Sequence, residues 1–499
     1  MIFNEESPFF DNYININSES SDSNVRDAAQ LKNRPFNDDF LLRSEVASKI
    51  YYDYVKDLPI IDYHCHIVPK EIADDISFEN ITKLWLGADH YKWRYMRACG
   101  VDEKYITGDA SDKEKFDKWI DCLSFAVGNP LYHWSHLELK KYFGINGYVT
   151  PDNKDLIWER CNKILASGKL SARKIIENSN VQVLCTTDDP ADSLEYHEKI
   201  AADASFKTKV FPAFRPDCAM NLDNPDYESY IEKLAKASGH FIESFDDLKS
   251  AIVSRIDYFD KHGCTVADHG FDTLRFRMAD DSEIDLIFKK RLSGESCTEE
   301  EIHKFRTAFL LFVGAEYVKR DWVSQLHFAV KRENNDKIFA KAGANAGIDC
   351  INNTFSAADL ADFLNASSKA NALPKTIVYS LNPNDNALID TVIACFQDSS
   401  AKGKLQHGSA WWFNDNLIGM ESHLETLASL SSLNGFVGML TDSRSFVSYT
   451  RHDYFRRILC AYLGRIAENG EFPKDYSLLG KIAENVSYKN ALNYFNFKM

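Results

Sequence analysis

Short apolar runs recur along the chain, and segments with helical periodicity separate most of them. Runs of this length that end in polar clusters are typical of buried strands. Eight such runs occur, at residues 59–66, 181–186, 210–214, 264–267, 322–326, 376–381, 405–410 and 436–440. Helical patterns follow at residues 227–237, 246–262, 298–319, 357–370, 386–397 and 420–432. Eight strands alternating with helices predict an α/β protein, and specifically a (β/α)8 TIM barrel.

Two segments lie outside this alternation. Residues 70–178 show mainly helical patterns, so we expect a large helical insertion after the first strand. Residues 1–35 are rich in Asn, Ser and Asp, which predicts a polar, mobile N-terminal extension. An amphipathic helix is expected over residues 38–57, leading into the first strand. Residues 36–499 are therefore interpreted as a single barrel domain.

Composition narrows the classes of partner. The 499 residues are 44% hydrophobic and carry a net charge of −16, with no cluster of five or more Lys or Arg. This balance argues against nucleic acid or an anionic membrane as partner. Eleven scattered cysteines without a Cys-x-x-Cys pair predict free thiols in a reducing compartment. With neither a signal-peptide pattern nor a membrane-spanning apolar stretch, we expect a cytoplasmic protein, and we expect it to be a homo-oligomer.

The first apolar run ends in two histidines that suit a metal ion. Side chains alternate along a strand, so His64 and His66 leave the same face roughly 7 Å apart at Cα. Neutral imidazoles bind divalent zinc, and a catalytic zinc site adds a carboxylate and keeps one position open. A His-x-His pair also occurs often by chance, so this prediction depends on the rest of the chain.

Asp442 and Arg444 follow the last apolar run. The first and last strands of a closed barrel are neighbours, which would place Asp442 beside His64 and His66 as a third ligand. The alternative is that Asp442 caps the following helix. Arg444 points the same way if the chain stays extended, and otherwise it is a surface cation.

Arg215, Arg332 and His327 also lie near predicted strand ends. The two arginines, together with Arg444, would suit a small substrate with a carboxylate, because guanidinium groups bind carboxylates through two hydrogen bonds. Any one of them alone is more often part of a structural ion pair. His327 directly follows a buried run, so a catalytic or substrate-binding role competes with that of a core histidine.

Two residue pairs at strand ends have competing interpretations. For Asp268-His269 we expect a structural role. Trp411-Trp412 is typical of core packing, and at a barrel mouth it is also suited to stacking on a sugar.

Tyr91 lies in the predicted insertion, within a stretch of polar aromatic residues at 89–94; a second such stretch occupies 128–136. These stretches either pack on the surface or form a lid over the site. In a lid, a nearby guanidinium or metal ion would favour the ionised phenol of Tyr91, which could then transfer a proton.

Seven segments resemble one known family. They are residues 62–66 (Asp-Tyr-His-Cys-His), 89–94, 128–136, 186–190, 215–217, 411–415 and 440–446. In this order they resemble the uronate isomerase (glucuronate isomerase) family, a divergent branch of the amidohydrolase superfamily, whose barrels are of the metal-dependent hydrolase type. The resemblance runs from about residue 36 to the C-terminus, and the polar N-terminal extension departs from it.

The resemblance implies an activity and a set of site residues. The activity is interconversion of D-glucuronate with D-fructuronate, and of D-galacturonate with D-tagaturonate. One divalent metal ion, usually zinc, would be held by His64, His66 and Asp442. The side chains around the sugar acid would be Tyr91, Arg215, His327, Arg332, Trp411, Trp412 and Arg444. The fourth run offers no Lys or Glu to bridge a second ion, so a single ion is expected.

These residue types suit the implied chemistry. Moving a carbonyl from C1 to C2 requires a proton to leave C2 and return at C1 through a cis-enediol, with stabilisation of the oxyanion. Asp442 or Tyr91 can transfer the proton, and Arg444 can hold the enediolate. Two alternatives remain: a mononuclear metal-dependent amidohydrolase on the same barrel, with Asp442 as base, and a sugar-acid binding protein without turnover.

Overall fold

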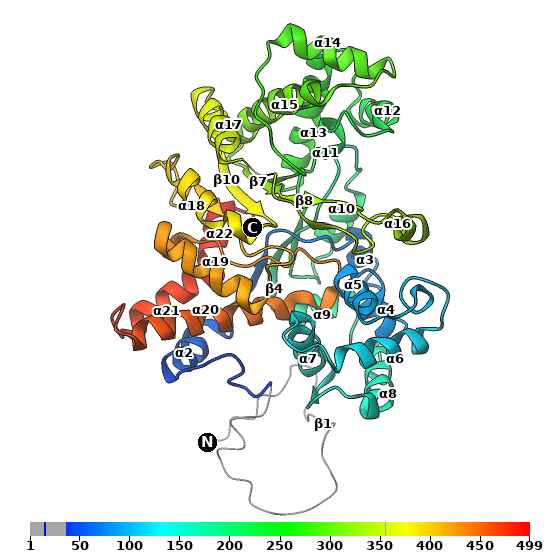
Figure 1. Ribbon diagram of the computed structural model, residues 1–499, viewed down its shortest axis with the longest axis vertical. Helices are drawn as coiled ribbons and strands as arrows, with labels where there is room; N and C mark the ends of the chain where they lie inside the picture. The colour runs from blue at the N-terminus through cyan, green and yellow to red at the C-terminus, as the bar shows by residue number, and fades with distance from the viewer. Residues whose placement is uncertain (1–13, 16–35, 355) are drawn as a thin grey trace, which may run out of the picture.

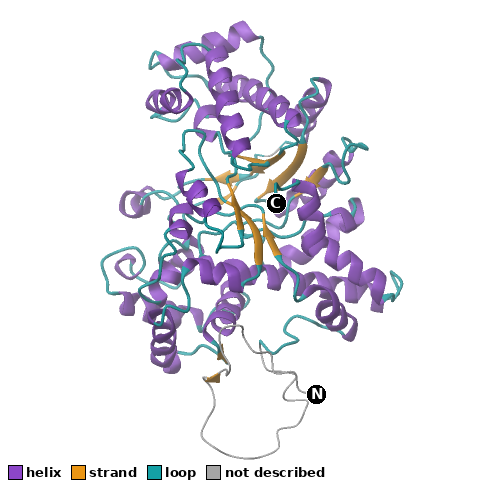
Figure 2. Ribbon diagram, turned by 180° about the vertical axis from the view of Figure 1, so that it is seen from behind, coloured by secondary structure: helices purple, strands orange, loops and turns teal. Residues whose placement is uncertain are grey.

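Helices surround a central group of strands in the computed structural model (Figure 1, Figure 2). The structure describes residues 14–15, 36–354 and 356–499. Seven of the predicted runs contain a strand of the two main sheets: β2 (Ile60–Asp62), β4 (Val181–Cys185), β5 (Lys209–Phe211), β6 (Val266–Gly270), β7 (Val323–Phe328), β10 (Lys375–Ser380) and β11 (Leu405–His407). The remaining described strands, β1 (Ile14–Asn15), β3 (Ile145–Asn146), β8 (Val330–Lys331) and β9 (Cys350–Ile351), form two small pairs.

The main strands pair in parallel and follow one another in chain order. β4 lies between β2 and β5, and β7 and β10 lie between β6 and β11. Parallel bridges from Phe214 to Asp188 and to Ala267 connect the two sheets. The predicted α/β class is therefore confirmed, with parallel sheets whose strands end at one common edge.

The eighth predicted run, residues 436–440, forms no strand, contrary to the sequence prediction. Gly438 has a φ of +80°, which interrupts an extended backbone. The segment nevertheless lies beside β2, because the Tyr63 hydroxyl donates to the Gly438 carbonyl at 2.7 Å. A little further on, the Asp442 N–H donates to the His64 carbonyl at 3.1 Å. The two ends of the predicted alternation thus meet through individual hydrogen bonds rather than a strand ladder.

Between β2 and β4 the chain is mainly helical. Local sequence starts several of these helices; at α6, for example, Ser111 and Glu114 form a reciprocal capping box. The helices are α3 (Pro69–Ala73), α4 (Ile81–Leu86), α5 (His90–Ala98), α6 (Asp112–Leu123), α7 (Pro130–Phe143), α8 (Lys154–Ala166) and α9 (Ala172–Asn178).

The other helices precede β2 or follow the later strands. The helix expected over residues 38–57 begins later, because Ser44 caps α2 by accepting the Ala47 N–H. The bounds are α2 (Glu45–Ile50), α10 (Glu195–Ala202), α11 (Asp217–Met220), α12 (Tyr227–Ser238), α13 (Phe245–Lys261), α14 (Asp281–Leu292), α15 (Glu299–Lys319), α16 (Asp336–Ala342), α17 (Ala357–Lys369), α18 (Asn386–Ala394), α19 (Leu417–Leu430), α20 (Thr450–Glu468), α21 (Tyr476–Glu484) and α22 (Asn490–Phe495).

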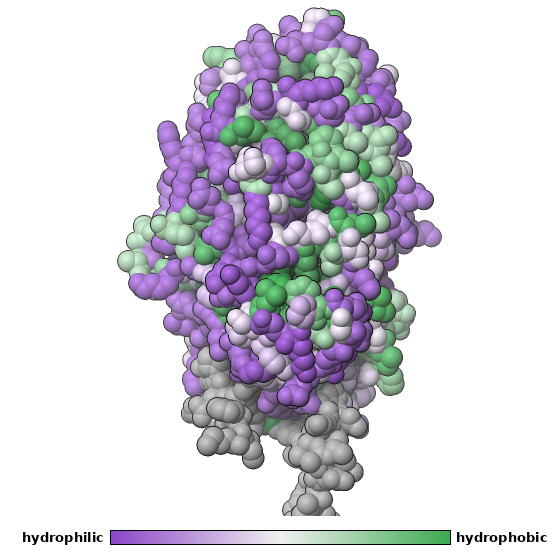
Figure 3. All heavy atoms as spheres, turned by 90° about the vertical axis from the view of Figure 1, so that its left-hand side faces the viewer, coloured by the Kyte–Doolittle hydropathy of each residue, from purple (hydrophilic) through white to green (hydrophobic). Residues whose placement is uncertain are grey.

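The face shown in Figure 3 is largely polar, with hydrophobic residues gathered in several patches. None of the helices in the described residues is long and apolar enough to cross a membrane. All eleven cysteines fall in the described part of the chain, and each is a free thiol there. Apart from β1, the predicted N-terminal extension lies outside the described residues.

Replacing Gly438 with alanine is expected to destabilise the fold by more than its φ angle alone explains. A non-glycine residue in the left-handed region costs about 1–3 kcal/mol. The new Cβ would also lie 2.1 Å from the Val486 carbonyl oxygen. Gly470→Ala is the matched control, because Gly470 has a φ of +75° and no atom within 4 Å of its added Cβ. Urea midpoints measure both variants, and equal midpoints would show that no steric cost is added at Gly438.

Candidate active site and metal group

The two histidines that follow β2 both contact Asp442. His64 Nε2 lies 3.2 Å from Asp442 Oδ1, and His66 Nε2 lies 3.1 Å from the same oxygen. The ligand atoms of the three residues all lie within 4.8 Å of one another. The structure therefore brings together the three side chains that the sequence suggested as metal ligands.

The backbone around Asp442 is held tightly. Asp442 has a φ of +46°, in the left-handed region that non-glycine residues seldom adopt. The preceding residue is fixed by Asp62, which accepts the Thr441 N–H at 2.8 Å and the Thr441 hydroxyl at 2.6 Å. The side chain of Asp442 is held as well, because Trp411 Nε1 donates to Asp442 Oδ2 at 2.5 Å. These contacts fix both the position and the direction of the Asp442 carboxylate.

The electrostatics of the three residues suit a divalent cation. Burial alone would raise the pKa of Asp442, but hydrogen bonds from His64 and His66 hold it well below its usual range. Burial lowers the pKa of His66 to about 4, so its imidazole is neutral at pH 7. Burial also acts to lower the pKa of His64, but the negative charges of Asp268 and Asp442 outweigh it and raise that pKa, and a divalent cation would take the place of the proton. Two imidazoles and a carboxylate form a common ligand set for zinc and related ions, and neutral imidazole is the form that binds them. The residues present therefore fit a divalent metal ion.

A cavity of about 240 Å³ adjoins this group. Every predicted site residue except Tyr91 lines it. The lining residues are His64, His66, His90, Arg215, Asp217, Asn221, Asp268, Gly270, His327, Arg332, Asn345, Asp349, Trp411, Trp412, Asp442 and Arg444.

Arg215 is fixed by two carboxylates. Its Nε lies 2.9 Å from Asp217 Oδ2, and its Nη1 lies 3.3 Å from Asp268 Oδ2. The backbone at Gly270 passes so close that an added Cβ would lie 2.6 Å from the Arg215 guanidinium. Arg215 is therefore a preorganised cation at the cavity wall.

Arg332 and Arg444 are held more loosely. Arg332 Nη1 lies 3.7 Å from Asp349 Oδ2. Arg444 contacts His90 Nδ1 and Asn345 Oδ1, each at 3.4 Å. Within the described residues, Arg444 forms no ion pair with a carboxylate. It is thus a cation at the cavity that can accept an anionic partner.

Asp268 and His327 form a second buried pair at the cavity. His327 Nδ1 lies 2.7 Å from Asp268 Oδ1, and both side chains join His64 in a second cluster of possible metal ligands. His327 Nε2 is buried without a hydrogen-bond partner in the described residues. Burial lowers the pKa of His327, so its ring is neutral at pH 7. With Nδ1 engaged by Asp268, Nε2 is the atom available to a ligand.

Asp268 and His269, for which we expect a structural role, face opposite ways. Asp268 points to the cavity, whereas His269 points the other way and meets the Tyr317 hydroxyl at 3.3 Å. Successive side chains of a strand leave opposite faces, so one residue of any such pair must point inward. Alternation along β6 therefore indicates that one of the two residues faces the cavity, but it does not say which one.

Tyr91 lies outside the residues that line the cavity. Its hydroxyl donates to Asp415 Oδ2 at 2.9 Å. Burial and the neighbouring Asp415 raise the pKa of Tyr91 well above its usual range. An ionised phenol therefore stays a prediction, and burial and this carboxylate oppose it more than the nearby Arg451 cation favours it.

Sequence reasoning missed several lining residues. His90 is adjacent to Tyr91, and Asp217 is the last residue of the Arg215-Pro216-Asp217 motif. Their position next to predicted site residues could therefore have identified them as lining residues. Asn345 and Asp349 follow α16 in a segment without a recognisable motif, and only the tertiary structure brings them to the cavity.

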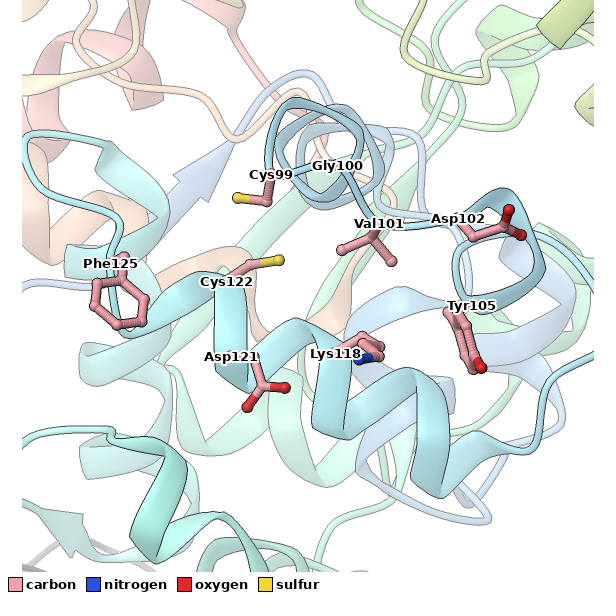
Figure 4. A pocket seen from close by; sticks show the side chains of 9 residues that line it. All are labelled: Cys99, Gly100, Val101, Asp102, Tyr105, Lys118, Asp121, Cys122 and Phe125. Carbon is pink, nitrogen blue, oxygen red and sulfur yellow. The ribbon is translucent and has the colours of Figure 1, made fainter.

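A larger hollow, of about 480 Å³, lies elsewhere, between the end of α5 and α6 (Figure 4). Its wall includes Cys99, Tyr105, Lys118, Cys122 and Phe125. None of its lining residues belongs to a cluster of possible metal ligands among the described residues. Size therefore does not identify the active site here, and the smaller cavity with its convergent charged groups is the better candidate.

Known proteins match the chain over most of its length. The family model of glucuronate isomerase matches residues 33–495. The chain belongs to the glucuronate isomerase family. The family resemblance predicted from seven sequence segments is thereby confirmed.

Individual members of the glucuronate isomerase family are similar in sequence and structure. The uronate isomerase of Lachnoclostridium phytofermentans is 54% identical over 465 residues, which cover 93% of this chain and all of that protein. The uronate isomerase of Lachnospira eligens is 53% identical over 461 residues, covering 92% of this chain and 98% of the relative. The crystal structure of uronate isomerase from Thermotoga maritima aligns with a TM-score of 0.87 at 33% identity, covering 92% of this chain and 99% of that one.

Removing either histidine is expected to lower metal content. His64→Ala and His66→Ala each delete one of three ligands, so bound metal should fall well below one ion per chain, as measured by elemental analysis after dialysis. His262→Ala is the control, because His262 pairs with Glu198 away from the cavity and should leave metal content unchanged. Full occupancy in both ligand variants would remove the proposed metal group.

Proposed function

We propose that the chain is an aldose-ketose isomerase that interconverts D-glucuronate with D-fructuronate and D-galacturonate with D-tagaturonate. The main supporting observation is a single cavity that joins the His64, His66 and Asp442 group to three arginines. A sugar acid offers a carboxylate to the cations and hydroxyl and carbonyl oxygens to a metal ion. Relatives named uronate isomerase, aligned over nearly their whole length, support the same assignment.

The proposal includes the architecture. Residues 36–499 would form one (β/α)8 TIM barrel of the metal-dependent hydrolase type, with residues 70–178 inserted after the first strand. In this arrangement the segment 436–441 takes the place of the eighth strand. Closure at β2 is supported by the Tyr63 hydroxyl, which donates to Gly438, and by the N–H of the following Asp442, which donates to His64. On the other side, the Gln406 side chain on β11 donates to the carbonyl of Gly435, just before the segment, at 3.0 Å.

In this proposal, arginines bind the substrate carboxylate. Arg215 and Arg332 would pair with the carboxylate, since guanidinium groups bind it in a fixed geometry. Trp411 and Trp412 would pack against the carbon chain of the sugar acid. His327 would meet a substrate hydroxyl through its unpartnered Nε2.

Asp442 and Tyr91 would transfer the proton between C2 and C1, and the Arg444 cation would stabilise the enediolate. Arg444 lacks a carboxylate ion pair in the described residues, so it can face the anion of the enediolate. Tyr91 enters as a neutral phenol because its pKa is raised. When bound by His64, His66 and Asp442, a divalent ion, which we take to be zinc, would supply Lewis acidity toward substrate oxygens.

The proposal also covers location and assembly. Eleven free cysteines in the described residues support a cytoplasmic location. The homo-oligomer expected from the sequence stays a prediction, and light scattering on the purified protein would measure it.

Isomerisation in deuterium oxide tests the proposed reaction. Incubation with D-glucuronate should yield a ketose of unchanged composition that carries solvent deuterium at C1, because the proton taken from C2 exchanges with solvent. Neutral D-glucose should not react, since it lacks the carboxylate that the arginines bind. Release of a hydrolysis product from an amide or ester, without isomerisation of uronates, would select the amidohydrolase alternative.

Tyr91→Phe tests whether the hydroxyl takes part. The variant keeps the ring and removes only the phenol oxygen, so kcat for D-glucuronate should fall by about 10²–10⁴-fold if that oxygen transfers or orients a proton. Metal content should not change. Tyr95→Phe, one turn further along α5 and away from the cavity lining, is the control. A wild-type kcat in Tyr91→Phe would reduce Tyr91 to a packing residue.

A further inference from the structure

Arg451, in the first turn of α20, is a buried cation that lies behind the active site. Its side chain is 2% exposed, and it does not line the cavity. A guanidinium is costly to bury unless its hydrogen-bonding groups find partners. The contacts of Arg451 therefore indicate the role of this buried charge.

One contact fixes the peptide that leads into Asp442. Arg451 Nη1 donates to the Thr441 carbonyl at 3.3 Å. The N–H and the hydroxyl of Thr441 are bound by Asp62. Arg451 thus completes the hydrogen bonding of Thr441 immediately before the left-handed Asp442. An unusual backbone conformation of this kind persists only where the surroundings determine it.

A second contact reaches the loop that carries the tryptophans. Arg451 Nη1 lies 3.7 Å from Asp415 Oδ2. Asp415 accepts the Tyr91 hydroxyl on the same oxygen and closes the segment that begins with Trp411. Since Trp411 Nε1 donates to Asp442, the loop and the carboxylate are connected from both sides.

A third set of contacts joins the helical region between β2 and β4. The Arg451 guanidinium lies 4.0 Å from the centre of the Trp134 ring on α7 and 5.2 Å from that of Tyr91 on α5. Cations over aromatic faces are held electrostatically, most strongly where water is excluded. Arg451 therefore contacts the peptide before Asp442, the loop that carries the tryptophans, and the helices α5 and α7.

We propose that Arg451 is a positioning residue that holds Asp442, the tryptophan loop and α5 in one arrangement. This inference rests on the proposed function for its kinetic consequences, whereas its effect on metal binding does not depend on the substrate. Because Arg451 touches no residue of the metal group directly, it acts through Thr441, Asp415 and Tyr91.

The test compares Arg451 with Arg457 on the same helix. Arg457 is also buried and charged, but it pairs with Asp453 and Tyr51 away from the cavity. The four variants are Arg451→Met, Arg451→Lys, Arg457→Met and Arg457→Lys. Each is measured for kcat and KM with D-glucuronate, for zinc affinity by chelator competition, and for thermal unfolding.

Arg451→Met should lose about 10- to 100-fold in zinc affinity, the range typical of residues that orient metal ligands. Its kcat should fall at least tenfold with KM within threefold, because Arg451 does not touch substrate. Arg451→Lys should recover only part of the zinc affinity and part of kcat, since one ammonium cannot replace a guanidinium that reaches Thr441 and Asp415 together. The Arg457 variants should lose stability while zinc affinity and kcat stay within twofold of wild type.

Two results would overturn the proposal. The first is that Arg451→Met and Arg457→Met lose similar stability and also have similar zinc affinity and kcat. Arg451 would then have only a structural role. If Arg451→Met does not fold, Arg451→Lys decides, and wild-type zinc affinity and kcat in that variant would refute the proposal. A wild-type chain inactive on D-glucuronate would refute the proposed function instead, and the zinc affinities would still decide the role of Arg451.

Discussion

One carboxylate oxygen, Asp442 Oδ1, joins the beginning of the folded chain to its end. It lies within hydrogen-bonding distance of both His64 and His66, although 376 or more residues separate them in sequence. A buried carboxylate is unstable without such partners, and buried imidazoles likewise need theirs. The contact can form only if β2 and the segment that follows β11 lie side by side. These contacts therefore bring together the two ends of the series of parallel strands.

Charge balance then determines what the cavity can bind. The chain has a net charge of −16, yet three arginines line one cavity. Ion pairs with Asp217 and Asp268 hold the Arg215 guanidinium in a fixed position. Arg444 hydrogen-bonds only to uncharged groups in the described residues, His90 and Asn345. A cation that is partly buried and lacks a carboxylate partner in the described residues favours an anionic ligand, and this property separates the cavity from the larger hollow near Cys99.

The helices between β2 and β4 supply groups that the strands cannot. α5 brings His90 to the cavity and Tyr91 to Asp415, and α7 brings Trp134 over Arg451. A strand end can present side chains only at its own edge of the sheet, so residues behind the cavity must come from another element. These helices therefore enclose the site and connect it to α20.

The sequence by itself determined the α/β class, seven of the strands and the family, because apolar periodicity and short motifs are local properties. It also identified His64, His66, Arg215 and His327 as residues near strand ends, where chemistry concentrates, and Asp442 as the residue that follows the apolar run at 436–440. It could not determine that residues 436–440 form no strand, since this follows from the φ of Gly438 and its contact with Val486. Nor could it determine that Asp268 faces the cavity, that burial raises the pKa of the Tyr91 phenol, or that Asn345 and Asp349 line the cavity with Arg451 behind it. Those outcomes depend on which side chains share a dry interior, and burial, unlike periodicity, is decided only when distant segments of the chain pack together.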